Sequence, residues 1–111
     1  MNKKTYSVLW SESAQFDLES IIDYIADESK LNAKKVFEEI KEHCLRFEDF
    51  PKIGKIPPEL KNINIETYRE IVVAPWRILY RVNNDEVLVL AVIDSRRDID
   101  DTLLNRLLNR K

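Results

Sequence analysis

Five arginines share the stretch of dense strand-forming sequence from Tyr68 to Ile99: Arg69, Arg77, Arg81, Arg96 and Arg97. A guanidinium keeps its charge in proteins and presents a planar fork of donors that matches phosphate or carboxylate. Three of the five lie inside apolar runs, and two follow directly after the last run. Cations carried on a rigid sheet predict a surface that binds an anion.

A structural role for these arginines competes with that interpretation. Arginine stems often cover sheet faces, and their heads often bridge to carboxylates across a strand. For Arg81, which has Asp85 and Glu86 nearby in the sequence, the structural role is the favoured one. For Arg77 and Arg97 both roles stay open.

Other reactive residue types are sparse. The single cysteine, Cys44, cannot form an internal disulfide, and the single histidine, His43, cannot make a metal cluster by itself. Cys44 falls on the apolar side of a predicted helix and is interpreted as a small buried hydrophobe. The acidic run Asp98, Asp100 and Asp101 suits a helix N-terminus better than a metal site. We expect no metal and no cofactor.

Composition predicts one ordinary globular domain over residues 1–111. The chain is 44% hydrophobic and 34% charged, and it has one glycine and four prolines. No apolar run approaches the length needed to cross a bilayer, and the start lacks the apolar segment of a signal peptide. We therefore expect a cytoplasmic protein with no membrane partner.

The charge is distributed unevenly. Residues 11–49 contain 11 acidic and 5 basic residues, a balance of −6, so the overall −2 leaves +4 on the remainder. The basic part includes the predicted sheet. A local cationic face can hold a polyanion while the acidic part repels it and so constrains its orientation.

Periodicity predicts the elements that position these charges. Alternation predicts a strand over Thr5–Trp10, and Ser11 or Ser13 is expected to cap a following helix. Asn32 is the expected cap of a second helix, after a turn near Ser29 to Leu31. Both helices carry apolar stripes at helical spacing: Ala14, Leu18, Ile21, Ile22 and Ile25 in the first, and Ala33, Val36, Phe37, Ile40, Cys44 and Phe47 in the second.

Prolines and turn residues divide the second half of the chain into a loop and strands. Pro51 is expected to end the second helix and to open an irregular loop that carries Lys52 and Lys55. Three runs separated by Ala74-Pro75 and by Asn83-Asn84-Asp85 predict an antiparallel meander, in which Trp76 and Tyr80 belong to the core. A short helix follows, with an apolar face made by Leu103, Leu104, Leu107 and Leu108.

The resulting order is β-αα-βββ-α. It predicts an α+β domain in which the N-terminal helical hairpin packs on one face of an antiparallel sheet and the other face stays partly open.

These segments resemble the RelE/ParE superfamily of small toxins from type II toxin-antitoxin modules. The resemblance covers almost the whole chain and is carried by YSVLW, SAQFDLESIIDYIADES, FPKIGKIPPEL, YREIVVAPWRILYRV and VLAVIDSRRDI. It implies a toxin that a cognate antitoxin holds inactive. RelE-like members cleave messenger RNA on the ribosome without a metal, whereas ParE-like members poison DNA gyrase and are not nucleases.

The resemblance also implies roles for individual residues. Arg77 in WRILY stands where RelE-like enzymes place a phosphate-binding arginine, and Arg97 in DSRRD corresponds to their second catalytic arginine. Arg69 lies near the position of a basic residue that acts in proton transfer. Asp94 is expected to pair with Arg77 or Arg97 and to orient it. Four further residues are candidates for binding the target or a phosphate: Arg96, Arg81, Lys55 and Lys52.

The chain departs from the nuclease pattern in its acid and base groups. Leu103 stands where a RelE-like enzyme offers a tyrosine, Asp94 stands where many members have a histidine, and Glu70 or Ile71 replaces the second of two paired lysines. Metal-free RNA cleavage requires groups that move protons, and arginines are poor bases. ParE-like gyrase poisoning is therefore slightly preferred. A RelE-like ribosome-dependent endoribonuclease and a degenerate, non-toxic antitoxin-binding module remain the alternatives.

Overall fold

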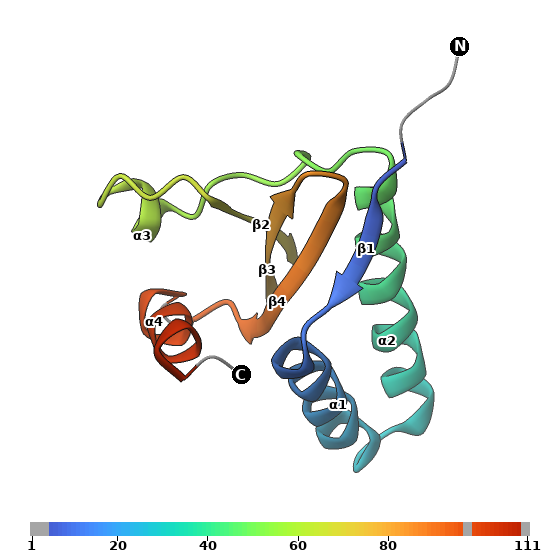
Figure 1. The fold of residues 1–111 in the computed structure, drawn as a ribbon. Coiled ribbons are helices and arrows are strands. Elements are labelled where there is room, and N and C mark those ends of the chain that lie inside the picture. The colour runs from blue at the N-terminus through green and yellow to red at the C-terminus, as the bar shows by residue number, and fades with distance from the viewer. Residues whose placement is uncertain (1–4, 97–98, 110–111) are drawn as a thin grey trace.

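The fold is a four-stranded sheet with helices on both faces. The computed structural model describes residues 5–96 and 99–109, with the backbone only at 100, 104 and 107–109. Figure 1 shows the sheet between the hairpin of α1 and α2 on one side and α3 and α4 on the other. In chain order the elements are β1 (Ser7–Trp10), α1 (Glu12–Ala26), α2 (Lys30–Leu45), η1 (Arg46–Glu48), α3 (Pro58–Lys61), β2 (Tyr68–Val73), β3 (Trp76–Asn83), β4 (Glu86–Asp94) and α4 (Ile99–Asn109).

Serine hydroxyls cap both helices of the hairpin. Ser11 accepts a hydrogen bond from the amide of Ala14 at 3.0 Å, which confirms one of the two predicted caps of α1. The predicted cap of α2, Asn32, is wrong, because Ser29 takes that role. Its backbone is extended, and its hydroxyl accepts from the Asn32 amide at 3.1 Å. The helix thus begins at Lys30, inside the segment that was expected to be a turn.

The segment after α2 is more regular than its prolines predict. The helix ends at Leu45 rather than near Pro51, and a 3-10 turn follows it. Further on, Pro58–Lys61 form a short helix, α3, although this segment was expected to be irregular. Proline suits the first turn of a helix because the missing N–H would have no intrahelical partner there. This short helix brings Glu59 and Leu60 to the sheet.

The meander is antiparallel as predicted, and β1 adds a parallel strand to it. The strand order is β1-β4-β3-β2, with β2 and β4 both antiparallel to β3. The turn at Asn84 has a positive φ of 55°, and the Ala74-Pro75 peptide bond at the other turn is cis. Because α1 and α2 return the chain, β1 pairs with β4 in parallel, so the sheet is mostly antiparallel.

A bulge in β4 lies at the centre of the sheet. Leu79 pairs with Ala91 and Tyr80 pairs with Val89, so Leu90 has no partner in the ladder. Such a bulge leaves the carbonyl of the extra residue available to other groups. The Leu90 carbonyl accepts hydrogen bonds from the Ser11 hydroxyl at 3.4 Å and from the Arg106 guanidinium at 2.7 Å.

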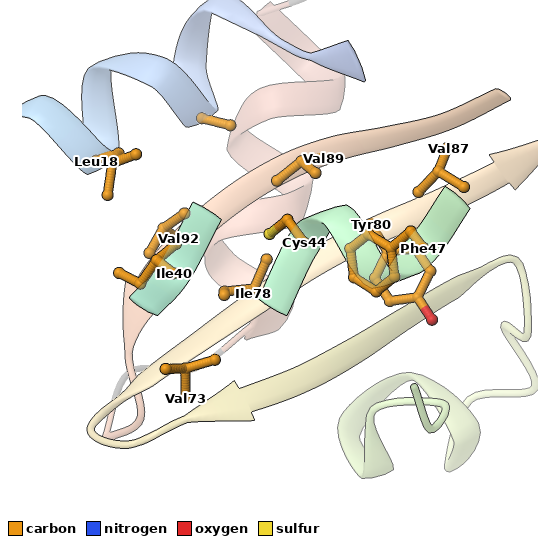
Figure 2. Packing of buried hydrophobic residues seen from close by; sticks show 11 residues of the cluster. Leu18, Ile40, Cys44, Phe47, Val73, Ile78, Tyr80, Val87, Val89 and Val92 are labelled. Carbon is orange, nitrogen blue, oxygen red and sulfur yellow. The ribbon is translucent and has the colours of Figure 1, made fainter. Parts of the chain in front are cut away.

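The hairpin side of the sheet holds the larger core. Figure 2 shows Cys44 among the buried aliphatic side chains and the Tyr80 ring against Phe47, with ring centroids 4.0 Å apart. Burial raises the pKa of the Cys44 thiol to about 12, which confirms its interpretation as a buried hydrophobe. Tyr80 is fully buried and Trp76 is packed against the same cluster, so both belong to the core as predicted.

A second, smaller cluster lies on the opposite face of the sheet, beneath α3 and α4. Its buried members are Leu60, Tyr68, Leu79, Ala91, Ile93, Ile99 and Leu103. This face is therefore covered further than the sequence pattern indicated, although a cavity remains between the sheet and α4. The side chains of Leu104, Leu107 and Leu108, expected to share this packing, lie outside the described part. No helix within the described ranges is long and apolar enough to span a membrane.

Candidate functional site

Arg77 lies on the α3 and α4 side of the sheet, between two carboxylates. Its Nε and Nη2 donate to Glu70 Oε1 and Oε2 at 2.6 and 3.0 Å, and its Nη1 and Nη2 donate to Glu59 Oε2 and Oε1 at 2.8 and 2.9 Å. Only 11% of the Arg77 side chain is exposed, and Glu70 is almost completely buried. Arg77 on β3 is thus joined to β2 through Glu70 and to α3 through Glu59, each time by a bidentate ion pair, the strong form of this contact.

The contact between Arg77 and Glu59 shifts the pKa values of both residues. Hydrogen bonds from Arg77 lower the pKa of Glu59 to about 2. Hydrogen bonds from Glu59 and Glu70 in turn raise the pKa of Arg77 above its usual value. A phosphate that approached Arg77 would have to displace the side chains of Glu59 and Glu70. The geometry therefore favours the structural alternative for Arg77 over phosphate binding.

Arg69 orders the loop before β2. Its Nη1 donates to the Gly54 carbonyl at 2.7 Å and lies 3.5 Å from the Lys52 carbonyl. The Gly54 amide donates to the Tyr80 hydroxyl at 2.8 Å. Lys52 and Lys55 are exposed on the same loop, where they are accessible to a partner.

Asp94 holds Arg96. Its Oδ1 accepts from the Arg96 amide at 2.9 Å and from Arg96 Nε at 3.0 Å, while Oδ2 accepts from Nη2 at 3.0 Å. Arg96 itself is 88% exposed, so it remains a candidate for contact with a target. Arg97, the other expected partner of Asp94, lies outside the described residues. The carboxylates that fix Arg77 are Glu59 and Glu70, which the sequence interpretation did not assign to that role.

A second charged contact joins α1, β4 and α4. Arg106 Nη2 donates to Asp17 Oδ1 at 2.7 Å, and the other oxygen of Asp17 accepts from the Val92 amide at 2.9 Å. Sequence reasoning missed this pair, because Asp17 and Arg106 are 89 positions apart and each looks like a solvent-facing residue of its own helix.

The pairing of Glu70 with Arg77 could have been predicted from the sequence. Glu70 is a carboxylate inside an apolar strand, and it lies diagonal to Arg77 in the hairpin.

Arg81 differs from the other arginines of the sheet. It lines a cavity of about 340 Å³ between the sheet and α4, together with Arg106 and mainly apolar residues. Its Nε is buried and has no hydrogen-bond partner among the described residues, and the same is true of the Thr102 hydroxyl in the cavity wall. The structural interpretation of Arg81, which involved Asp85 or Glu86, is not supported by a bond at this nitrogen.

Part of the cationic surface that the composition predicts is paired with carboxylates. Arg77 is bound to two carboxylates, Arg96 to Asp94 and Arg106 to Asp17. Two described arginines line the cavity, and of these Arg106 is paired with Asp17, whereas Arg81 has no carboxylate partner among the described residues. Within the described ranges no group of three or more His, Cys, Asp or Glu side chains is arranged to hold a metal ion.

A family model and a curated relative indicate one family, and solved structures share the fold. Residues 8–99 match the family described as the ParE toxin of type II toxin-antitoxin system, parDE. The toxin ParE3 of Caulobacter vibrioides is 32% identical over 54 residues, which span 49% of this chain and 50% of that toxin, so the alignment covers about half the length of this curated relative.

Two solved structures share the fold. A chain of the chromosomal ParDE toxin-antitoxin system from P. aeruginosa aligns with a TM-score of 0.67 at 21% identity, over 82% of this chain and 97% of that one. A chain of the RelBE2 toxin-antitoxin complex from Mycobacterium tuberculosis aligns with a TM-score of 0.59 at 15% identity, over 84% of this chain and 94% of that one. At these identities the structural likeness establishes the fold alone. The assignment to a family rests on the match to the family model.

Proposed function

This chain belongs to the ParE family of toxins of type II toxin-antitoxin systems, and from that premise we propose that it stops growth by poisoning DNA gyrase in the cytoplasm. The choice of gyrase as the target rests on the hydrogen bonds that Arg77 already makes. A RelE-like nuclease needs this arginine to hold the scissile phosphate while charge builds on it. Here Glu59 and Glu70 already bind all three of its nitrogens.

The acid and base groups support the same choice. Arg69 is engaged with a loop carbonyl, Asp94 with Arg96, and Leu103 of α4 is buried against the sheet. A nuclease would need one side chain to take the proton of the 2′-hydroxyl and another to protonate the leaving oxygen. Neither role is matched by the contacts of these residues. A toxin that acts by binding to gyrase has no such requirement.

The test is to induce the full chain without an antitoxin and to measure growth, gyrase-DNA cleavage complexes and the 5′ ends of messages in the same culture. Gyrase poisoning predicts trapped cleavage complexes, an SOS response and intact messages. Codon-positioned cuts that disappear in the Arg77→Ala, Arg97→Ala double variant would overturn the proposal in favour of the endoribonuclease. Unimpaired growth with a folded wild-type product would overturn it in favour of a degenerate binding module.

A cognate antitoxin is the second partner that we propose. Support comes from large apolar side chains on the surface of the described chain: Phe16 and Tyr24 on α1 are 68% and 77% exposed, and Leu31 on α2 is 81% exposed. Phe16 and Tyr24 are eight residues apart and so lie on one helix face. Exposed apolar surface of this kind marks a protein contact.

The antitoxin proposal is tested by co-expression. A short reading frame adjoining this gene is expected to encode a DNA-binding protein that copurifies with the chain and restores growth. Phe16→Ser with Tyr24→Ser is expected to weaken that complex, whereas Lys35→Ser, an exposed change elsewhere on the hairpin, is the matched control. An adjoining protein that neither binds the chain nor restores growth would refute it.

A further inference from the structure

The cavity between the sheet and α4 has the features of a ligand site. Its floor and walls come from strands β2, β3 and β4, from helix α4 and from the cap of α1. Leucine and alanine side chains make half of the lining, and the other half carries hydroxyls or guanidiniums. The residues that line it are Ser11, Tyr68, Leu79, Arg81, Leu88, Leu90, Ala91, Thr102, Leu103 and Arg106. Its volume of about 340 Å³ is in the range of small-molecule sites, which combine apolar walls with a few convergent polar groups.

Two residues of this wall carry an unsatisfied polar atom. Arg81 Nε and the Thr102 hydroxyl are both buried, and neither has a hydrogen-bond partner among the described residues. Thr102 as a whole is only 7% exposed. An orphaned buried donor carries the full cost of desolvation, and such atoms in native proteins require an explanation. Both atoms belong to residues that line the cavity, so an acceptor bound there lies close to two unsatisfied groups.

The charges around the cavity specify the acceptor. Arg106 is neutralised by Asp17 and also binds the Leu90 carbonyl. Arg81 makes no ion pair with a described residue of the cavity wall, so its guanidinium is the group that an anion in the cavity would meet. A carboxylate would satisfy the guanidinium in a bidentate manner and can accept from the threonine hydroxyl as well. The apolar walls would pack on the remainder of the molecule.

We propose that this cavity binds a small organic acid, a carboxylate carried on a compact apolar body. Arg81 holds the carboxylate, Thr102 donates to it, and Leu79, Leu90 and Leu103 enclose the apolar part. The inference does not depend on whether gyrase or the ribosome is the target. Because Thr102 and Leu103 belong to α4, occupancy would hold α4 against the sheet.

Titration of the purified full chain with 3-phenylpropionate, followed by NMR, tests the proposal. Binding is expected to shift the resonances of Arg81 Nε–H and of the residues around Thr102. The neutral analogue 3-phenylpropanamide and inorganic phosphate are each expected to bind at least about tenfold more weakly, because one lacks the charge and the other the apolar body. Equal binding of the neutral analogue, or no binding of the acid, would overturn the proposal.

Variants separate a ligand site from a structural contact. Arg81→Met is expected to weaken binding of the acid by about tenfold or more, and Thr102→Val by a smaller factor. Lys35→Met removes an exposed charge on α2 and should leave the affinity unchanged. Neither cavity variant is expected to lower the thermal midpoint of the free chain, because each removes an unsatisfied atom. A lowered midpoint in Thr102→Val would show that the hydroxyl has a structural partner and would count against the site.

A peptide with a free C-terminus presents the same chemistry as a small acid. An acetylated tripeptide that ends in leucine is therefore included as a second probe. We expect it to bind more weakly than 3-phenylpropionate, because the cavity is partly enclosed. Tighter binding of the peptide would overturn the assignment to a small acid.

Discussion

At the scale of single residues, the guanidinium of Arg77 is compatible with two roles, phosphate binding and a structural ion pair. In the sequence it is a cation on a strand, which suits a phosphate. In the structure it is the centre of a contact with Glu59 and Glu70. The two roles make different predictions for stability, because a buried carboxylate that loses its cation is strongly destabilising.

Replacement of Arg77 by methionine is expected to lower the free energy of unfolding by about 3–5 kcal/mol, since Glu70 would stay buried without a partner. Urea denaturation followed by circular dichroism measures the change. Arg96→Met is the matched control: its side chain is 88% exposed, and the free energy of unfolding should not change measurably. Equal effects of the two variants would show that Arg77 is not held in this way.

The buried cysteine makes a second prediction at this scale. Burial raises the pKa of Cys44 to about 12, and the residue is 1% exposed. Because the thiolate is the reactive form, the native chain is expected to react with iodoacetamide at pH 8 at least about a hundredfold more slowly than the unfolded chain. Mass spectrometry of native and guanidinium-unfolded samples measures both rates. Comparable rates would place the thiol at the surface.

At the scale of elements, the cap of α2 is a correction that can be tested directly. Ser29→Ala removes the acceptor of the Asn32 amide and is expected to cost about 1 kcal/mol of folding stability. Asn32→Ala, at the position that the sequence pattern indicated, should be close to neutral because alanine is the better helix former. Chemical denaturation of both variants compares them. A larger loss in the asparagine variant would restore the original assignment.

The loop before β2 depends on the only glycine in the chain. A Cβ on Gly54 would lie 2.5 Å from the Glu70 carbonyl oxygen and 2.7 Å from the Tyr80 hydroxyl, which is too close for either atom. Gly54→Ala is therefore expected to destabilise the chain by about 2–3 kcal/mol. The neighbouring exposed residue provides the control, Lys55→Ala, which should have little effect. Thermal unfolding of both variants tests this, and a neutral glycine substitution would contradict the close approach.

Most elements were predictable because local signals determine them. The meander follows from three β-rich runs and two turns, and the hairpin helices follow from their apolar stripes. The errors have local causes too. Ser29 and Asn32 are both suitable cap residues, and the sequence pattern indicated Asn32. Proline breaks helices, but at Pro58 it favours the first turn of one. Boundaries depend on such small differences in free energy.

At the scale of the whole molecule, the parts that were not predictable are contacts between distant segments. No local pattern relates Asp17 to Arg106, or Glu59 to Arg77. The parallel pairing of β1 with β4 also joins segments at opposite ends of the chain. The five arginines therefore appeared as a candidate site from their type alone, while their partners came from the fold. The cavity at Arg81 was also not predictable from local patterns, because it forms between the sheet and α4, which are distant segments of the chain.

The contact between α3 and the sheet has a consequence for the stability of the whole chain in acid. The pKa of Glu59 is lowered from 4.5 to about 2 by hydrogen bonds from Arg77. A carboxylate with a lowered pKa in the folded state contributes stability above its unfolded pKa and loses it as the pH falls towards the folded value. The contribution should thus be complete above pH 4.5 and disappear towards pH 2.

The expected size of this loss, after allowance for partial exposure, is about 1–2 kcal/mol. Urea denaturation at several pH values between 2 and 7 measures it. Glu59→Gln removes the titrating group, so the loss of stability due to Glu59 should be absent in that variant. Arg77→Met should abolish the same loss, because it removes the cause of the pKa shift. The double variant should lose no more of the acid dependence than either single variant. If Glu59→Gln kept the full acid dependence of the wild type, other carboxylates would be responsible, and α3 would not be held to the sheet by this ion pair.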